Sequence, residues 1–174
     1  MRYIPTSQLE QTAAEILTEH DVLRTPIPID VLAHRMGVRV EIVPLGEEIS
    51  GVLVVEDGAG VIGVNAAHST NRQRFSIAHE LAHYRLHRRQ QELFIDRAFS
   101  AVFRDHKSSR GEDRLEIQAN QLAAALLMPR VLLEDELAQG DFDLGSDESL
   151  LDLARRFGVS REAMAFRISN LELF

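Results

Sequence analysis

Cysteine is absent from the 174 residues of this chain. A protein without cysteine has no disulfide bond, no thiol nucleophile and no thiolate metal ligand. Any metal site here must therefore use histidine and carboxylate side chains, and the sequence offers seven histidines and 27 acidic residues for that purpose.

Long apolar runs are absent as well. No stretch approaches the roughly 20 apolar residues of a membrane-spanning helix, and residues 1–8 lack the apolar core of a signal peptide. We therefore expect a cytoplasmic protein with no membrane partner. Positive charge is scarce, since 19 Lys and Arg face 27 Asp and Glu and the formal net charge is −8. This charge repels phosphate backbones, so direct nucleic acid binding is not expected.

What remains is an ordinary globular composition, with 45% hydrophobic and 26% charged residues. Helical spacing of apolar residues extends to about residue 20, and Pro28 opens a short helix that Gly37 ends. A period of two then predicts a strand at 38–42, and residues 51–55 and 61–64 are typical of a hairpin. The later pattern is helical. The sequence thus predicts an α+β fold, with a small antiparallel sheet packed against a mainly helical core.

The C-terminal part, residues 150–171, predicts two helices around a turn at 158–160 and is similar to a DNA-binding helix-turn-helix. From residue 146 to 174, however, four arginines face five acidic residues, so no basic stripe is present to bind phosphates. We expect one domain over residues 1–140 and a C-terminal helical, helix-turn-helix-like segment over 141–174 that packs on it. The polar residues 104–113 predict a mobile loop.

An H-E-x-x-H pattern at residues 79–83 indicates a candidate metal-binding site. On a helix, His79 and His83 lie one turn apart on one face, so both imidazoles can bind one Zn²⁺. Glu80 is rotated about 100° from His79, so its carboxylate can act on a metal-activated water without binding the metal. A capping box at 70–73 and an apolar stripe support the helix. The pattern favours zinc-dependent hydrolysis with Glu80 as general base.

A third protein ligand is needed, because a catalytic zinc usually has three. His87 lies about 12 Å along the helix axis from His79 and cannot complete the same site. We favour Glu116, since Asn120 lies one turn further on the same face and can hold the outer N–H of a ligand histidine. The other acidic candidates are Asp113, Glu92 and Asp96.

Two blocks of sequence are specific when taken together: N-R-Q-R-F-S-I-A-H-E-L-A-H at 71–83 and E-I-Q-A-N-Q-L-A-A-A-L-L-M-P at 116–129. They resemble the ImmA/IrrE metallopeptidase family, and looser similarity covers most of the chain. The resemblance implies a gluzincin-like site with His79, His83 and Glu116 as zinc ligands and Glu80 as base. It also implies a helix-turn-helix transcriptional repressor as substrate, since family members typically cleave one. Gln118 departs from the family, where a second Glu is common.

We therefore expect a zinc metalloendopeptidase that cleaves a specific regulatory protein. Strand 61–64 could pair with an extended substrate at its edge. Residue type alone leaves four candidates for an oxyanion donor, namely Tyr84, His87, His68 and His106. Two alternatives stay open: a zinc-stabilised protein-binding regulator without proteolysis, and a zinc amidohydrolase that acts on a small substrate. A binding module would keep its function in Glu80→Gln, whereas an enzyme would lose it.

Overall fold

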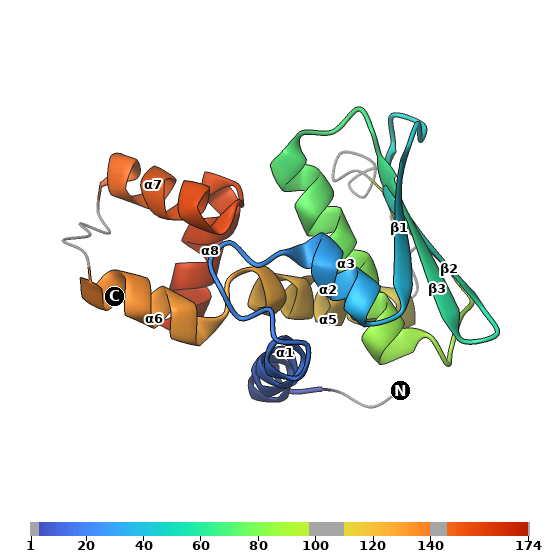
Figure 1. The fold of residues 1–174 in the computed structure, drawn as a ribbon, viewed down its shortest axis with the longest axis horizontal. Coiled ribbons are helices and arrows are strands. Elements are labelled where there is room, and N and C mark those ends of the chain that lie inside the picture. Colours follow the sequence, from blue (N-terminus) through green and yellow to red (C-terminus); the bar gives the residue numbers. More distant parts are fainter. Residues whose placement is uncertain (1–3, 98–109, 140–145, 174) are drawn as a thin grey trace.

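The structure is a computed structural model that describes residues 4–97, 110–139 and 146–173. Its elements follow the order shown in Figure 1. The front of the chain forms α1 (Thr6–Glu19), α2 (Ile29–Arg35), β1 (Val38–Val43), β2 (Ile49–Glu56) and β3 (Ala59–Asn65). The remainder forms α3 (Thr70–His87), β4 (Leu93–Arg97), α5 (Arg110–Leu127), α6 (Arg130–Gln139), α7 (Asp147–Phe157) and α8 (Arg161–Leu171). The predicted α+β class is confirmed.

The sheet has the strand order β1-β3-β2-β4 and is mixed rather than antiparallel throughout. The predicted hairpin is present, with Leu53 of β2 opposite Ile62 of β3. β1 pairs with the other side of β3 and runs parallel to it. Our expectation of a substrate edge at residues 61–64 is wrong, because β3 is hydrogen-bonded to a strand on each side.

β4 is a strand that the sequence pattern did not predict. It pairs antiparallel with β2 at the edge of the sheet, with Phe94 opposite Leu53. Phe94 is buried, whereas Leu93 and Ile95 on either side of it are exposed, as expected for a strand with one face on the core. An apolar run of three residues is too short for its period to distinguish a strand from the end of a helix.

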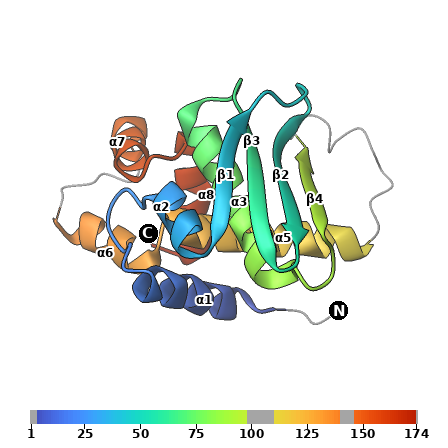
Figure 2. The same ribbon diagram turned by 45° about the vertical axis from the view of Figure 1, so that its right-hand side comes forward.

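The helix α3 packs against the sheet on one side and against α5 on the other, and α1 covers α5 in turn (Figures 1 and 2). Small residues line this packing: Ala78 and Ala82 in α3 and Ala119 and Ala123 in α5 are fully buried. Such side chains let two helix axes come close together. The middle of α3 is therefore enclosed, and the first half of α5 is brought beside it.

Part of the segment that was predicted to be a mobile loop, residues 104–113, is the start of α5. The helix begins at Arg110, inside the predicted loop, so the backbone of residues 110–113 is helical. Residues 104–109, the rest of the predicted mobile loop, lie outside the described residues.

The turn between α7 and α8 is tied to the N-terminal part of α3. The Nε of Arg74 donates to the carbonyl oxygen of Gly158 at 3.0 Å, and the amide of Asn71 donates to that of Val159 at 3.0 Å. Gly158 ends α7 with φ of 64°, and a Cβ at this position would stand 2.9 Å from Arg74 Nε. Only glycine meets both demands without strain.

A second link joins α8 to the front of the chain. Arg167 is buried, donates from Nε to the carbonyl oxygen of Met128 at 2.9 Å, and pairs through Nη2 with Glu10 of α1 at 2.8 Å. The C-terminal helices therefore pack on the rest of the molecule. The expected domain boundary near residue 140 falls within 140–145, outside the described residues. In the part of the chain that is described, no helix is long and apolar enough to cross a membrane.

Candidate metal centre

The H-E-x-x-H residues lie in the enclosed middle of α3. His79, Glu80 and His83 are 2%, 0% and 1% exposed. The helix begins one residue after Ser69, but the expected capping box is not formed. Instead the side chain of Gln73 donates to the carbonyl oxygen of Asn65 at the end of β3, which ties the helix start to the sheet.

Donor atoms of three side chains converge on one point. The Nε2 atoms of His79 and His83 lie 3.1 Å apart. Glu116 on α5 places Oε2 3.1 Å from His79 Nε2 and Oε1 3.2 Å from His83 Nε2. Ligands bound 2.0–2.1 Å from a tetrahedral zinc lie about 3.3–3.4 Å apart, so the observed triangle is close to the size that such an ion requires.

Burial and the contacts within this triad shift the pKa values of its three members. Burial alone would raise the pKa of Glu116, but hydrogen bonds and charge from His79 and His83 lower it to about 2. Burial alone would lower the pKa of His79, but Glu116 and the nearby carboxylates raise it to about 9. For His83 burial prevails and the pKa falls. The ionised carboxylate and the neutral imidazole are the forms that bind a metal, which would displace the proton on His79.

Glu80 is a buried carboxylate without a hydrogen bond. Neither of its oxygens has a partner within the described part of the chain. Its side chain packs against Gly51 of β2, where an added Cβ would meet Glu80 Oε1 at 3.1 Å. Burial raises the pKa of Glu80 from 4.5 to about 8. An unpaired buried carboxylate beside three convergent donors fits a site meant to hold an ion and a water, because such a group is costly to bury otherwise.

Hydrogen bonds support the outer side of each imidazole. Nδ1 of His79 lies 3.0 Å from Oδ1 of Asn120, which is the partner expected from the sequence. Nδ1 of His83 lies 3.1 Å from Nδ1 of His87. The ring of His83 also stacks on Phe94 of β4 at 4.6 Å between centroids. Two ligand candidates are thus held from behind by polar and aromatic contacts.

Asp96 on β4 is nearer to the centre than the sequence suggested. Its carboxylate forms a second group with His79 and Glu80, in which the potential ligand atoms all lie within 4.8 Å of one another. Burial raises its pKa. The side chain of Asp113, the main rival to Glu116, lies outside the described residues.

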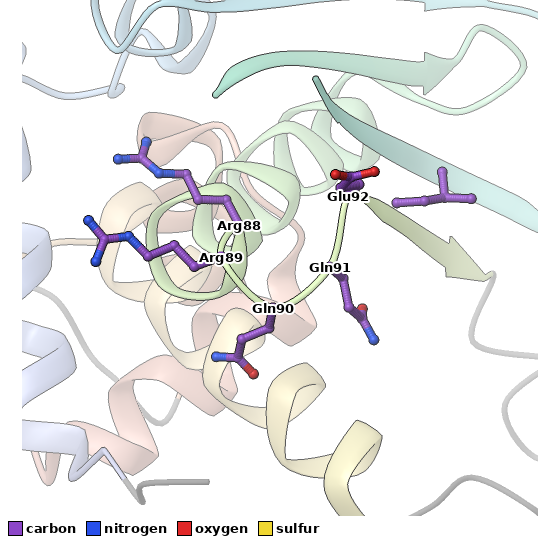
Figure 3. A pocket seen from close by; sticks show the side chains of 6 residues that line it. Arg88, Arg89, Gln90, Gln91 and Glu92 are labelled. Carbon is purple, nitrogen blue, oxygen red and sulfur yellow. The ribbon is translucent and has the colours of Figure 1, made fainter. Parts of the chain in front are cut away.

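The remaining acidic candidate, Glu92, lines a pocket of about 610 Å³ at residues 88–93, beyond the end of α3. Figure 3 shows Arg88 and Arg89 extending to one side of this loop and Glu92 at its other end. None of these residues belongs to the convergent donor groups found among the described residues. This pocket is therefore separate from the candidate metal centre.

Among the described candidates for an oxyanion donor, Tyr84 and His87 are engaged elsewhere and His68 belongs to neither donor group. The hydroxyl of Tyr84 donates to the carbonyl oxygen of Gly58 in the β2–β3 turn at 2.7 Å. Both ring nitrogens of His87 have partners in the interior. His68 lies before α3 and is part of neither donor group, and His106 lies outside the described residues.

Two contacts of His83 were not predicted from the sequence. Its ring stacks on Phe94, and its Nδ1 lies beside Nδ1 of His87. The contact with His87 could have been predicted, because His83 and His87 have the same i, i+4 spacing as His79 and His83. The contact with Phe94 depends on β4, whose pairing with β2 no local pattern revealed.

Comparisons with known proteins show which family the chain resembles. The sequence profile of the Peptidase_M78 family, described as the IrrE N-terminal-like domain, matches residues 33–169. The chain is 30% identical over 139 residues to the radiation response metalloprotease IrrE of Deinococcus deserti, covering 77% of this chain and 43% of that protein. The corresponding protein of Deinococcus radiodurans is also 30% identical over 139 residues, which are 77% of this chain and 37% of the relative.

A solved structure has a similar fold. A transcriptional regulator of Mycobacterium tuberculosis superposes with a TM-score of 0.62 at 25% identity, over 96% of this chain and 48% of that one. This chain therefore spans less than half the length of each of these three proteins.

Proposed function

The chain belongs to the IrrE N-terminal-like family of metallopeptidases, and on that premise we propose that it is a zinc-dependent endopeptidase that cleaves a specific regulatory protein. The observation that carries the proposal is the triangle of His79, His83 and Glu116, with the unpaired carboxylate of Glu80 beside it. We assign the first three as metal ligands and Glu80 as the general base.

The donor set fits zinc, because two imidazole nitrogens and one carboxylate form an open catalytic site of three protein ligands. A zinc ion bound there would lower the pKa of a water molecule and polarise the scissile carbonyl. Glu80 would take the proton from the attacking water and return it to the leaving amine. In the metal-free protein burial raises the pKa of Glu80, and a zinc ion beside it would lower that pKa and favour the ionised carboxylate, which is the form that accepts a proton.

The substrate would approach along β4. Among the described strands β4 is paired only with β2, so within the described part of the chain its outer edge is unpaired and could hydrogen-bond an extended peptide. The same strand carries Phe94 against His83 and Asp96 beside Glu80. A peptide on this edge would run past the proposed metal centre, so cleavage would require a segment that can become extended.

We propose a helix-turn-helix transcriptional repressor as the protein substrate, in the cytoplasm, and no direct binding of nucleic acid. A peptidase in that compartment must spare other proteins, and a need for one extended segment and a docking surface gives such restraint. The net charge of −8 favours encounter with a basic partner, and DNA-binding repressors are often basic. The proposed peptidase domain is residues 1–140, and contacts such as that of Arg74 with Gly158 support packing of the described part of segment 141–174 on it.

The test is cleavage of repressors encoded near this gene by zinc-loaded wild type and Glu80→Gln, with casein as the unselective substrate. We expect one or two cuts in one repressor by wild type, none by Glu80→Gln although it retains zinc, and little turnover of casein. Tight binding without cleavage by wild type would favour a protein-binding regulator. Efficient turnover of casein would refute the regulatory substrate and leave a peptidase.

A further inference from the structure

Behind His83, a chain of hydrogen bonds runs through two polar side chains that the proposed mechanism does not use. Nδ1 of His87 lies 3.1 Å from Nδ1 of His83, and Nε2 of His87 lies 3.1 Å from Oε1 of Gln118. His87 is on the last turn of α3 and Gln118 is on α5, two residues after Glu116. They are 1% and 7% exposed, respectively.

The positions of the protons in this chain follow from the donor and acceptor roles. A neutral imidazole carries one N–H, and a metal ligand must keep the lone pair on the nitrogen that faces the metal. With Nε2 of His83 at the metal centre, its proton is on Nδ1 and is donated to His87. His87 must then accept at Nδ1 and carry its own proton on Nε2. That proton is donated to the amide oxygen of Gln118, and no donor faces another donor.

We propose that His87 and Gln118 are positioning residues that hold His83 in its metal-binding tautomer and orientation, and so set the affinity of the centre for zinc. This inference rests on the proposed metal centre and extends it. Gln118 fixes the tautomer of His87, and His87 fixes that of His83. The outward nitrogen of His79 lies instead beside the amide oxygen of Asn120, which can only accept, so an amide supports one ligand histidine and an imidazole supports the other.

The burial of His87 and Gln118 indicates that they do more than fill the core. Two polar side chains between packed helices are costly unless each hydrogen bond is made, and apolar residues would fill the same space without that demand. Here both ring nitrogens of His87 are used. Partners of this kind fix the ring of a ligand histidine and strengthen it as a ligand.

The test uses two substitutions of His87 whose side chains have the same number of heavy atoms and the same branching at Cγ. In His87→Asn an amide oxygen takes the place of Nδ1 and can accept from His83, as Asn120 does from His79. In His87→Leu a methyl group takes that place and accepts nothing. Zinc affinity is measured by competition with a chelator, which is a readout independent of peptidase activity.

We expect His87→Leu to weaken zinc binding by about ten-fold or more and His87→Asn to stay within about three-fold of wild type. Gln118→Met removes the second acceptor and should weaken binding by about three- to ten-fold. The same change three residues along the helix, Gln121→Met, should leave affinity unchanged. If His87→Leu does not fold, the zinc affinities of Gln118→Met and Gln121→Met are compared instead, and equal affinities would contradict the proposal.

Nitrogen-15 spectra of the histidine side chains in the zinc-loaded protein give a second readout. We expect His83 to be protonated at Nδ1 and His87 at Nε2. A proton on Nδ1 of His87, or equal affinities for His87→Leu and His87→Asn, would overturn the inference while leaving the metal centre intact. If wild type holds no zinc, the proposed metal centre fails, and the inference fails with it.

Discussion

The substitution Glu80→Gln should stabilise the metal-free protein, by an amount that grows with pH. The carboxyl group of Glu80 is 0% exposed and has no partner among the described residues. Burial raises its pKa from 4.5 to about 8. Between these values the folded protein keeps a proton on Glu80 that the unfolded chain has released, so the stability of wild type falls as pH rises through this window.

The dependence of the free energy of unfolding on pH gives the size of the expected difference. One unbalanced proton changes the free energy of unfolding by about 1.4 kcal/mol per pH unit. A glutamine at this position does not titrate, so between pH 5.5 and 7.5 the difference between variant and wild type should widen by roughly 2–3 kcal/mol. Below pH 4.5 the difference should be small, because a neutral carboxyl group and an amide are similar in shape and polarity.

Urea unfolding of both proteins in the presence of a chelator measures this difference at each pH. Glu56→Gln, which replaces an exposed carboxylate on β2, is the control and should show nearly the same difference from wild type at both pH values. If the difference for Glu80→Gln is also independent of pH, then Glu80 is ionised in the fold and the argument from its burial is wrong.

Three further substitutions test the scaffold. Gly158→Ala should cost about 1–3 kcal/mol by urea unfolding because φ is 64°, whereas Gly46→Ala, which meets nothing within 4 Å, should be close to neutral. Arg167→Met breaks a buried ion pair and should cost about 3–5 kcal/mol, whereas Arg161→Met, at an exposed pair, should cost less than about 1 kcal/mol. In Gly51→Ala the added Cβ would contact the carboxylate of Glu80, the proposed general base, so peptidase turnover should fall while zinc content stays unchanged. Unchanged turnover would contradict the packing described.

Local patterns predicted much of the fold and the residues of the candidate centre. The H-E-x-x-H pattern indicates its own geometry, because a helix alone brings His79 and His83 together. Glu116 was chosen with the help of Asn120 on the same helical face, and the structure brings both to His79. These inferences needed only the period of a helix and the chemistry of the side chains.

What was missed depends on contacts between distant parts of the chain. The parallel pairing of β1 with β3 and the edge position of β4 are set by packing of the whole sheet, and a three-residue apolar run does not reveal them. Phe94 was therefore not placed beside α3, and Asp96 was named only as one of several acidic candidates for the third ligand. Gln118 could be noted only as a departure from the family, because its contact with His87 depends on how α3 and α5 pack.

The central claim is that His79, His83 and Glu116 form one zinc centre, with Glu80 beside the metal but not bound to it. Zinc content per chain, measured on purified wild type and four variants, tests it most directly. The account predicts about one zinc in wild type and in Glu80→Gln, and loss of zinc in His79→Ala, His83→Ala and Glu116→Ala. Full zinc occupancy in Glu116→Ala, or no zinc in wild type, would contradict it.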